Sequence, residues 1–151
     1  MQRINVAVVG VGYWGPGLVR NFLKIPEVNM SIICDLDRKK LEKFSREYKS
    51  IKTTTNFQKI IRDKSIAIVA IATPTSTHYE LAKKALSAGK HVLIEKPFTK
   101  SLAEAQELVS LAKNKKRILM IGHTFIYSGA IQKIKDTLSQ GTRQPEHTAN
   151  R

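Results

Sequence analysis

The sequence predicts a doubly wound α/β fold, in which helices cover both faces of a parallel sheet. Five short apolar runs and a weaker sixth recur at intervals of about 25 to 30 residues. These runs are continuous rather than alternating, which is typical of strands buried on both faces. Amphipathic helical patterns lie between them, as right-handed β-α-β units require.

The strands are expected where the apolar runs lie, and the intervening helices predict crossover connections rather than hairpins. The expected strands are Ile4 to Val9, Met30 to Cys34, Ile66 to Ile71, His91 to Ile94 and Ile118 to Ile121, with a weaker strand at Ile51 to Thr53.

Helical periodicity marks two elements in the first half of the chain after the opening glycine-rich turn. One is the helix from Leu36 to Tyr48, and a shorter helix follows it. Their inward apolar residues are Leu41, Phe44 and Tyr48 in the first, and Phe57, Ile60 and Ile61 in the second.

Two helices in the second half each open with a capping box, in which a Ser or Thr is followed three residues later by Glu. The boxes are Thr77 with Glu80 in Thr77 to Ala88, a helix that ends at Gly89, and Ser101 with Glu104 in Ser101 to Lys113. Their apolar stripes are Leu81, Ala82, Ala85 and Leu86, and Leu102, Ala105, Leu108, Val109 and Ala112. A last amphipathic helix is expected at Gly129 to Ser139.

The composition is that of one globular domain. The 151 residues are 42% hydrophobic and 25% charged, which argues against a disordered chain, a collagen or a coiled coil. The longest apolar run, Ile66 to Ala72, is far shorter than the roughly 20 residues that cross a bilayer, and Met1 to Asn5 lacks the features of a signal peptide. Together with the single cysteine, Cys34, this predicts a cytoplasmic protein without a membrane partner.

The net charge of +14 is the unusual figure, and it favours polyanions in general. The basic residues are spread along helix faces, and neither interleaved aromatics nor zinc-ligand spacing accompanies them. We therefore favour solvated helix faces, or compensation by an acidic part elsewhere, over a nucleic-acid site. No metal site is expected.

The segment Gly10 to Gly15 reads G-V-G-Y-W-G directly after the first strand. In a dinucleotide fingerprint Gly10 permits the tight turn, Gly12 lets the main chain approach a pyrophosphate, and Gly15 allows close packing of helix on strand. The following helix N-terminus supplies N–H donors and the positive end of its dipole. A glycine-rich structural turn is the alternative.

Asp35 ends the second strand about 20 residues beyond Gly15, the spacing at which a carboxylate binds the ribose hydroxyls of the cofactor. Such a carboxylate repels a 2′-phosphate, so NAD is favoured over NADP. Arg38 keeps NADP possible, because a guanidinium there could neutralise that phosphate. Alternatively, Asp35 or Asp37 caps the next helix.

Two further segments follow the carboxyl ends of strands, where α/β sheets bind ligands. The first runs from Ala72 through Thr73, Pro74 and Thr75 to His78, which is either a cleft residue or a surface histidine. The second is Glu95-Lys96-Pro97, which directs an ammonium group toward the crevice, where it could polarise or protonate a substrate oxygen. A structural ion pair between Glu95 and Lys96 is the alternative.

In combination these motifs resemble the oxidoreductases named after glucose-fructose oxidoreductase, inositol dehydrogenase and the MocA protein, the Gfo/Idh/MocA family. The resemblance covers about Arg3 to Gly141 and depends on Val9 to Pro16, on Ala72-Thr73-Pro74 with His78, and on Ala88 to Pro97. Gly122 to Tyr127 resembles the branch that oxidises nucleotide-linked N-acetyl sugars at C3, the UDP-N-acetylglucosamine 3-dehydrogenase type.

The resemblance implies NAD or NADP on the N-terminal Rossmann domain, a catalytic role for Lys96, and a sugar or nucleotide-sugar substrate. It also implies a C-terminal α/β domain that carries substrate contacts, a catalytic histidine and the oligomer interface. The expected cofactor-binding residues are Gly10, Gly12, Tyr13, Trp14, Gly15, Asp35, Arg38, Ala72, Thr73, Pro74, Thr75, His78, Glu95, Lys96, Pro97 and His123.

The end of the chain departs from the family pattern. We expect a Rossmann domain over residues 1–127, the start of the family's C-terminal region over 128–141, and a disordered tail over 142–151 in a chain truncated before the second domain. His147, in that tail, is not taken as the family's second-domain histidine. Exposed Phe125, Tyr127 and final-helix residues predict self-association.

Three functions remain open at this point. The first is the cofactor half of a sugar dehydrogenase, with weak NAD(H) binding and little turnover alone. The second is a dinucleotide-binding module that works with a partner chain. The third is a basic nucleic-acid-binding protein.

Overall fold

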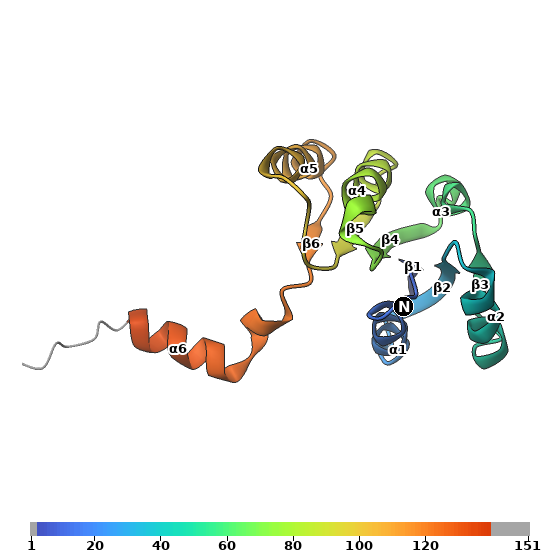
Figure 1. The fold of residues 1–151 in the computed structure, drawn as a ribbon, viewed down its shortest axis with the longest axis horizontal. Coiled ribbons are helices and arrows are strands. Elements are labelled where there is room, and N and C mark those ends of the chain that lie inside the picture. The colour runs from blue at the N-terminus through green and yellow to red at the C-terminus, as the bar shows by residue number, and fades with distance from the viewer. Residues whose placement is uncertain (1–2, 140–151) are drawn as a thin grey trace, which may run out of the picture.

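The computed structural model describes residues 3–139 and forms one sheet of six parallel strands in the order β3-β2-β1-β4-β5-β6 (Figure 1). The sheet is doubly wound because β1 to β3 are added on one side of β1 and β4 to β6 on the other. The strands are β1 (Ile4–Val9), β2 (Val28–Cys34), β3 (Lys52–Thr54), β4 (Ile66–Ile71), β5 (His91–Ile94) and β6 (Leu119–Ile121).

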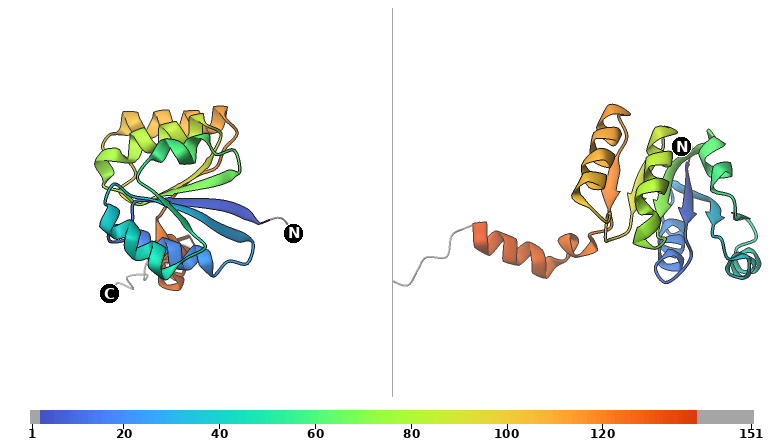
Figure 2. Two further views of the ribbon diagram at one scale, coloured as in Figure 1. Left: turned by 90° about the vertical axis from the view of Figure 1, so that its right-hand side faces the viewer. Right: turned by 45° about the horizontal axis from the view of Figure 1, so that its top comes forward.

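Helices cover both faces of this sheet, α1 and α2 on one face and α3, α4 and α5 on the other (Figures 1 and 2). The helices are α1 (Gly15–Leu23), α2 (Arg38–Glu47), α3 (Phe57–Arg62), α4 (His78–Ser87), α5 (Leu102–Asn114) and α6 (Gly129–Ser139), with short 3₁₀ turns η1 (Thr75–Thr77) and η2 (Thr124–Tyr127). The predicted fold class is confirmed.

The core has two layers, one on each side of the sheet, and β1 contributes to both. Val6 and Val8 pack with the α1 and α2 residues, while Ala7 and Val9 pack with those of α3, α4 and α5. All four are buried. Full burial on both faces explains why the strand sequence is continuously apolar.

The strand and helix predictions are confirmed with small shifts at their ends. β2 begins at Val28, two residues earlier than predicted, because Val28 pairs with Ile4 of β1. α2 begins at Arg38 because the Asp37 carboxylate caps it, accepting from the N–H groups of Lys39 and Lys40.

One of the two predicted capping boxes is wrong. Thr77 does not cap α4; its hydroxyl lies 2.8 Å from the Pro74 carbonyl oxygen and 2.7 Å from the Thr73 hydroxyl oxygen. The 3₁₀ turn before α4 places Thr77 in a helical conformation, so its side chain faces back along the chain. At α5 Ser101 does accept from the N–H of Glu104, at 3.2 Å.

The predicted apolar stripe of α5 is only partly buried. Leu108 and Ala112 lie in the core, whereas Leu102 and Val109 are exposed. α5 packs beside α4 above the β5 and β6 end of the sheet, so only a narrow strip of its surface is covered.

The last described segment lies apart from the sheet and from the helices that cover it. α6 projects away from the sheet (Figure 1), and its apolar residues are exposed together with Phe125 and Tyr127 of η2. The predicted disordered tail lies outside the described residues. Within residues 3–139, no helix has the length and apolar character that crossing a membrane requires.

Candidate active site at the carboxyl edge of the sheet

The carboxyl ends of all six strands are tied into one row by main-chain hydrogen bonds. The first residue after each of five strands donates its N–H to the last residue of the neighbouring strand. The pairs are Asp35 to Thr54, Gly10 to Cys34, Ala72 to Val9, Glu95 to Ile71 and Gly122 to Ile94, with N to O distances of 2.8 to 3.2 Å. Four predicted site residues therefore stand in one line, on both sides of the point between β1 and β4 where the strand order reverses.

The glycine turn is built as the fingerprint requires. Gly10 has a φ of +88°, and a Cβ on it would lie 2.7 Å from the Thr73 side chain and 2.8 Å from the Ala72 main chain. A Cβ on Gly15 would collide with the Gly10 carbonyl oxygen, so this glycine is needed for helix packing. Gly12 has no atom near its Cβ position, which leaves its main chain open to a ligand.

α1 begins directly after this turn without a side-chain cap. Trp14 occupies the N-cap position, and Pro16 lies in the first turn, where its missing N–H costs nothing. The N–H groups at this helix end and the positive end of the dipole face the turn beside Gly12. These features fit the pyrophosphate of a dinucleotide.

The Asp35 carboxylate is fixed by two main-chain donors. Its two oxygens accept from the N–H of Val11 at 2.7 Å and from the N–H of Asp37 at 2.8 Å. Asp37 caps α2, so the capping alternative is confirmed for Asp37 and wrong for Asp35. Each Asp35 oxygen keeps a lone pair for a further donor, as ribose binding requires. Arg38 is exposed and lines a recess of about 500 Å³ with Thr54 and Thr55.

His78 lies beneath the site rather than on the surface. Its ring is 1% exposed, so the surface alternative is wrong. Nε2 lies 2.8 Å from the Thr73 carbonyl oxygen, and Nδ1 lies 2.9 Å from that of Pro97 and 3.3 Å from that of Phe98. His78 therefore contacts the loops after β4 and β5, and its ring atoms face away from solvent.

Lys96 is exposed beside the glycine turn, in a loop whose Lys96–Pro97 peptide is cis. Its Nζ lies 5.4 Å from the centre of the Trp14 ring, a cation–π contact. Neither ion pair in residues 3–139, Lys40 with Asp37 and Lys83 with Glu107, involves Lys96. The predicted alternative of a Glu95–Lys96 ion pair is therefore wrong.

Sequence reasoning missed the role of Gly122. A Cβ on Gly122 would lie 3.1 to 3.2 Å from the Glu95 carboxyl group, so the absent side chain makes room for that carboxylate. Glu95 is half-buried and accepts from the N–H of Lys96 at 3.3 Å. The available signal was a glycine directly after an apolar strand.

The remaining predicted residues lie at the rim of the same edge. Tyr13 is 88% exposed and packs edge-to-face on Trp14, with ring centres 5.0 Å apart. Thr75 lies in the 3₁₀ turn η1, which Pro74 precedes. His123 is exposed and follows Gly122 before η2.

Cys34 is not a nucleophile candidate. Burial, with the neighbouring Asp35 carboxylate as a lesser cause, raises the pKa of its thiol to about 11. The thiol therefore stays protonated near neutral pH and serves as a core residue. Within the described part of the chain, no three His, Cys, Asp or Glu side chains gather as a metal site would need.

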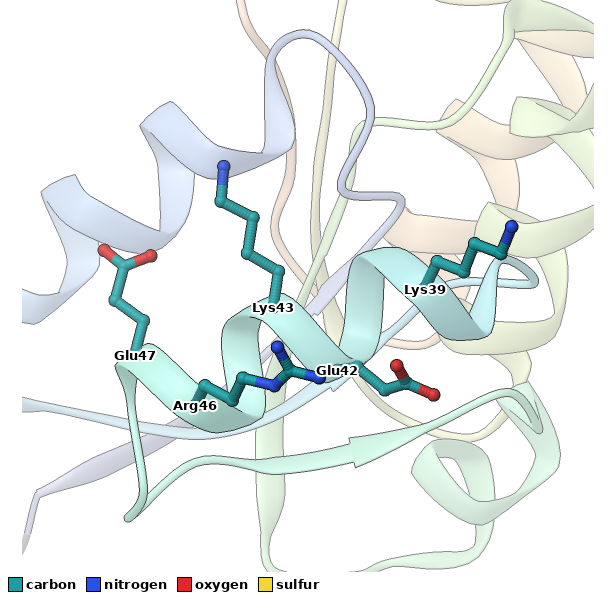
Figure 3. A pocket seen from close by; sticks show the side chains of 5 residues that line it. All are labelled: Lys39, Glu42, Lys43, Arg46 and Glu47. Carbon is teal, nitrogen blue, oxygen red and sulfur yellow. The ribbon is translucent and has the colours of Figure 1, made fainter.

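The basic surface of α2 mixes both signs of charge. A recess of about 410 Å³ on this helix is lined by Lys39, Glu42, Lys43, Arg46 and Glu47 (Figure 3). Glu42 with Arg46 and Lys43 with Glu47 are spaced four residues apart, as on solvated helix faces. This arrangement supports our interpretation of the charge on α2 as a solvated face.

Three solved structures resemble the chain over nine-tenths of its length. They are GenD2 from gentamicin A biosynthesis in complex with NAD (27% identity, TM-score 0.85), myo-inositol 2-dehydrogenase from Lactobacillus plantarum (27%, 0.84), and biliverdin reductase from Synechocystis sp. PCC 6803 in complex with biliverdin and NADP⁺ (28%, 0.82). The matches cover 90%, 93% and 90% of this chain, and 39%, 42% and 43% of those chains.

The chain also spans about 40% of the length of the curated relatives it matches. Residues 4–123 match the family model described as an oxidoreductase family with an NAD-binding Rossmann fold, Gfo/Idh/MocA. The match includes the glycine turn, Asp35 and Lys96. The chain is therefore an NAD-binding Rossmann domain and belongs to the Gfo/Idh/MocA family of oxidoreductases.

Proposed function

We propose that this chain forms the cofactor half of a dehydrogenase that moves a hydride between NAD(H) and a secondary alcohol of a sugar or nucleotide sugar. The observation that carries the proposal is the position of the Lys96 ammonium beside the glycine turn. Neither ion pair in residues 3–139 includes Lys96. Similarity to a myo-inositol dehydrogenase supports an alcohol substrate. The resemblance of Gly122 to Tyr127 to the nucleotide-sugar branch supports a sugar.

Different residues of the carboxyl edge bind different parts of the cofactor. The open main chain at Gly12 and the uncapped start of α1 hold the pyrophosphate. Asp35 accepts hydrogen bonds from the adenosine ribose hydroxyls, while Val11 and Asp37 hold its carboxylate in place. When bound, NAD⁺ supplies the hydride acceptor at C4 of its nicotinamide.

Lys96 acts on the substrate oxygen. In the direction of reduction, its ammonium stabilises the negative charge that develops on the carbonyl oxygen as the hydride arrives, and it donates a proton to that oxygen. In the direction of oxidation, the amine form accepts the proton of the alcohol as the hydride leaves for the nicotinamide. Trp14 holds the ammonium over its ring, which limits the positions that the long lysine side chain visits.

Asp35 favours NAD over NADP, because a 2′-phosphate would lie against a carboxylate whose two oxygens are fixed in place. Arg38 and Lys39 at the start of α2 reduce this preference, since both are exposed cations near that position. We expect NADH to bind more tightly than NADPH by about tenfold, a difference of about 1.4 kcal/mol.

The 151-residue chain alone turns over little substrate. The described residues contact the substrate from one side only, at the nicotinamide end of the cofactor site. Catalysis needs a substrate that is held in reactive geometry. Steady-state formation of NADH from NAD⁺ and a panel of sugar nucleotides, followed by absorbance, tests this. Turnover comparable to that of the longer relatives would contradict it.

A second candidate function is a cofactor subunit that works with a partner chain. The exposed apolar face of η2 and α6 favours it, with Phe125 76% and Leu138 68% exposed. The same face predicts self-association of the isolated chain. Light scattering at rising concentration, repeated with the double change Ile131→Glu and Ile134→Glu, tests this; a wild-type chain that stays monomeric contradicts it.

A further inference from the structure

The buried ring of His78 joins the two loops that form the centre of the site. His78 is the first residue of α4, and both of its ring nitrogens lie within 2.9 Å of a main-chain carbonyl oxygen. One carbonyl belongs to Thr73 after β4, and the other belongs to Pro97 after β5. Phe98 adds a third, longer contact to the nitrogen that faces Pro97.

Both contacts are at hydrogen-bond distance, and carbonyl oxygens accept from a ring N–H. The ring is enclosed between the two loops, so neither loop can move relative to the other without losing a contact with it.

No acidic side chain takes part in these contacts. The loop from Ala72 to Thr77 contains no ionisable residue, the loop after β5 contributes Glu95 and Lys96, and α4 contributes Tyr79 and Glu80 next to His78. Glu95 lies over Gly122, and Glu80 is exposed. The ring is therefore held by main-chain groups and not by a carboxylate.

The two carbonyls matter because of their neighbours. Thr73 lies against the Gly10 turn, because a Cβ placed on Gly10 would lie only 2.7 Å from the Thr73 side chain. Pro97 follows Lys96 directly, and Lys96 in turn lies over Trp14 of the same glycine turn. Fixing Thr73 relative to Pro97 thus fixes the cofactor turn relative to the lysine.

We propose that His78 is a positioning residue: its buried ring, in contact with both loops, holds the Lys96 loop at a set distance from the glycine turn. The catalytic consequence rests on the function proposed above. The position of Lys96 does not, and it can be measured without cofactor or substrate.

One spectroscopic readout follows from the composition of the chain. Trp14 is the only tryptophan, so its emission reports on the Lys96 ammonium over its ring. Lys96→Met calibrates how the emission changes when that ammonium is absent.

The experiment compares His78→Gln and His78→Phe with Leu86→Ala, a matched control in the same helix. Leu86 is fully buried in the core near the other end of α4, so its loss lowers stability without removing a hydrogen-bond contact of the His78 ring. In folded His78→Phe we expect Trp14 emission to shift toward that of Lys96→Met and NADH affinity to fall about tenfold, while folded Leu86→Ala changes neither.

Two results would overturn the proposal. One is Trp14 emission that stays at the wild-type position in folded His78→Phe and in folded His78→Gln, because the Lys96 loop would then not depend on the ring. The other is Leu86→Ala changing Trp14 emission and NADH affinity as much as His78→Gln does, because the role would then be general stability. If the wild-type chain fails to bind NADH, the proposed function fails, and the emission measurements still decide the role of His78.

Discussion

The two edges of the sheet each contain a buried basic side chain whose nitrogen atoms contact two main-chain carbonyls, but the edges serve different purposes. At the carboxyl edge His78 joins the two loops of the site. At the amino edge Lys90 donates from Nζ to the carbonyls of Asp63 at 2.5 Å and Ile66 at 2.8 Å, which joins the end of α3 to the start of β4. The same chemistry positions reactive loops at one edge and supports the fold at the other.

Each edge also contains a left-handed glycine, and these two differ in what surrounds them. Gly10 has a φ of +88° and no room for a Cβ, while Gly89 has a φ of +76° and its nearest neighbour, Arg117, lies 3.8 Å from a Cβ position. Conformation alone constrains Gly89, whereas conformation and crowding both constrain Gly10. Crowding marks the edge where loops from different strands meet.

The largest effect should come from giving both glycines the same side chain. Gly10→Ala should cost about 3 kcal/mol or more and abolish NADH binding, because strain at positive φ adds to collisions with Thr73 and Ala72. Gly89→Ala should cost about 1 kcal/mol through φ alone and leave NADH affinity unchanged. Urea unfolding measures the loss of stability in each variant, and calorimetric titration measures its NADH affinity. Equal losses of stability in Gly10→Ala and Gly89→Ala would contradict the comparison.

Removing the amino-edge cation should have a smaller effect, confined to stability. Lys90→Met leaves two main-chain carbonyls without their donor and should lower the free energy of unfolding by about 1 to 3 kcal/mol. NADH affinity should not change, because Lys90 lies at the opposite edge from Gly10. Lys84→Met, at an exposed site on α4, is the control and should be neutral. A loss of NADH binding in folded Lys90→Met would contradict the division between the edges.

The stability contributed by Lys90 should rise with pH. Burial lowers the pKa of its ammonium, with the Asp63 carboxylate as a lesser, opposing cause. The unfolded chain therefore binds this proton more tightly than the folded chain, and stability increases as pH rises toward the ordinary lysine pKa of 10.5. Denaturation of wild type and Lys90→Met between neutral and alkaline pH should show a widening difference, and a narrowing one would refute this.

The smallest effect should come from an exposed pair between α4 and α5. Hydrogen bonds from Lys83 and Tyr79 lower the pKa of Glu107, so its contribution is present above the ordinary glutamate pKa of 4.5 and is lost as the pH falls below it. Glu107→Gln should lower Tm slightly at neutral pH, by less than any change above, because exposed pairs contribute little. Thermal melts of the wild type and Glu107→Gln at acid and neutral pH test this. A Tm difference that persists at acid pH would contradict it.

The sequence predicts the row of strands and most of the site, because these features are local. The G-x-G-x-x-G turn, Asp35 at a strand end and Glu95-Lys96-Pro97 all depend on short-range spacing and strand order. Three features depend on loops distant in sequence: the burial of His78 under Pro97, the space that Gly122 leaves for Glu95, and the Trp14–Lys96 contact. Periodicity does not contain such contacts, which explains why the Thr77 cap and the surface alternative for His78 were wrong.

Calorimetric titration with NADH and NADPH of the wild-type chain, Asp35→Ala and Asp37→Ala tests the central claim most directly. Asp37→Ala is the matched control, since it removes the α2 cap, which costs about 1 kcal/mol of stability, but not the ribose carboxylate. We expect saturable NADH binding that exceeds NADPH binding in the wild type, weakens about tenfold or more in Asp35→Ala, and stays unchanged in Asp37→Ala. A folded wild-type chain that binds neither nucleotide, or an Asp35→Ala variant that binds NADH as the wild type does, would contradict the account.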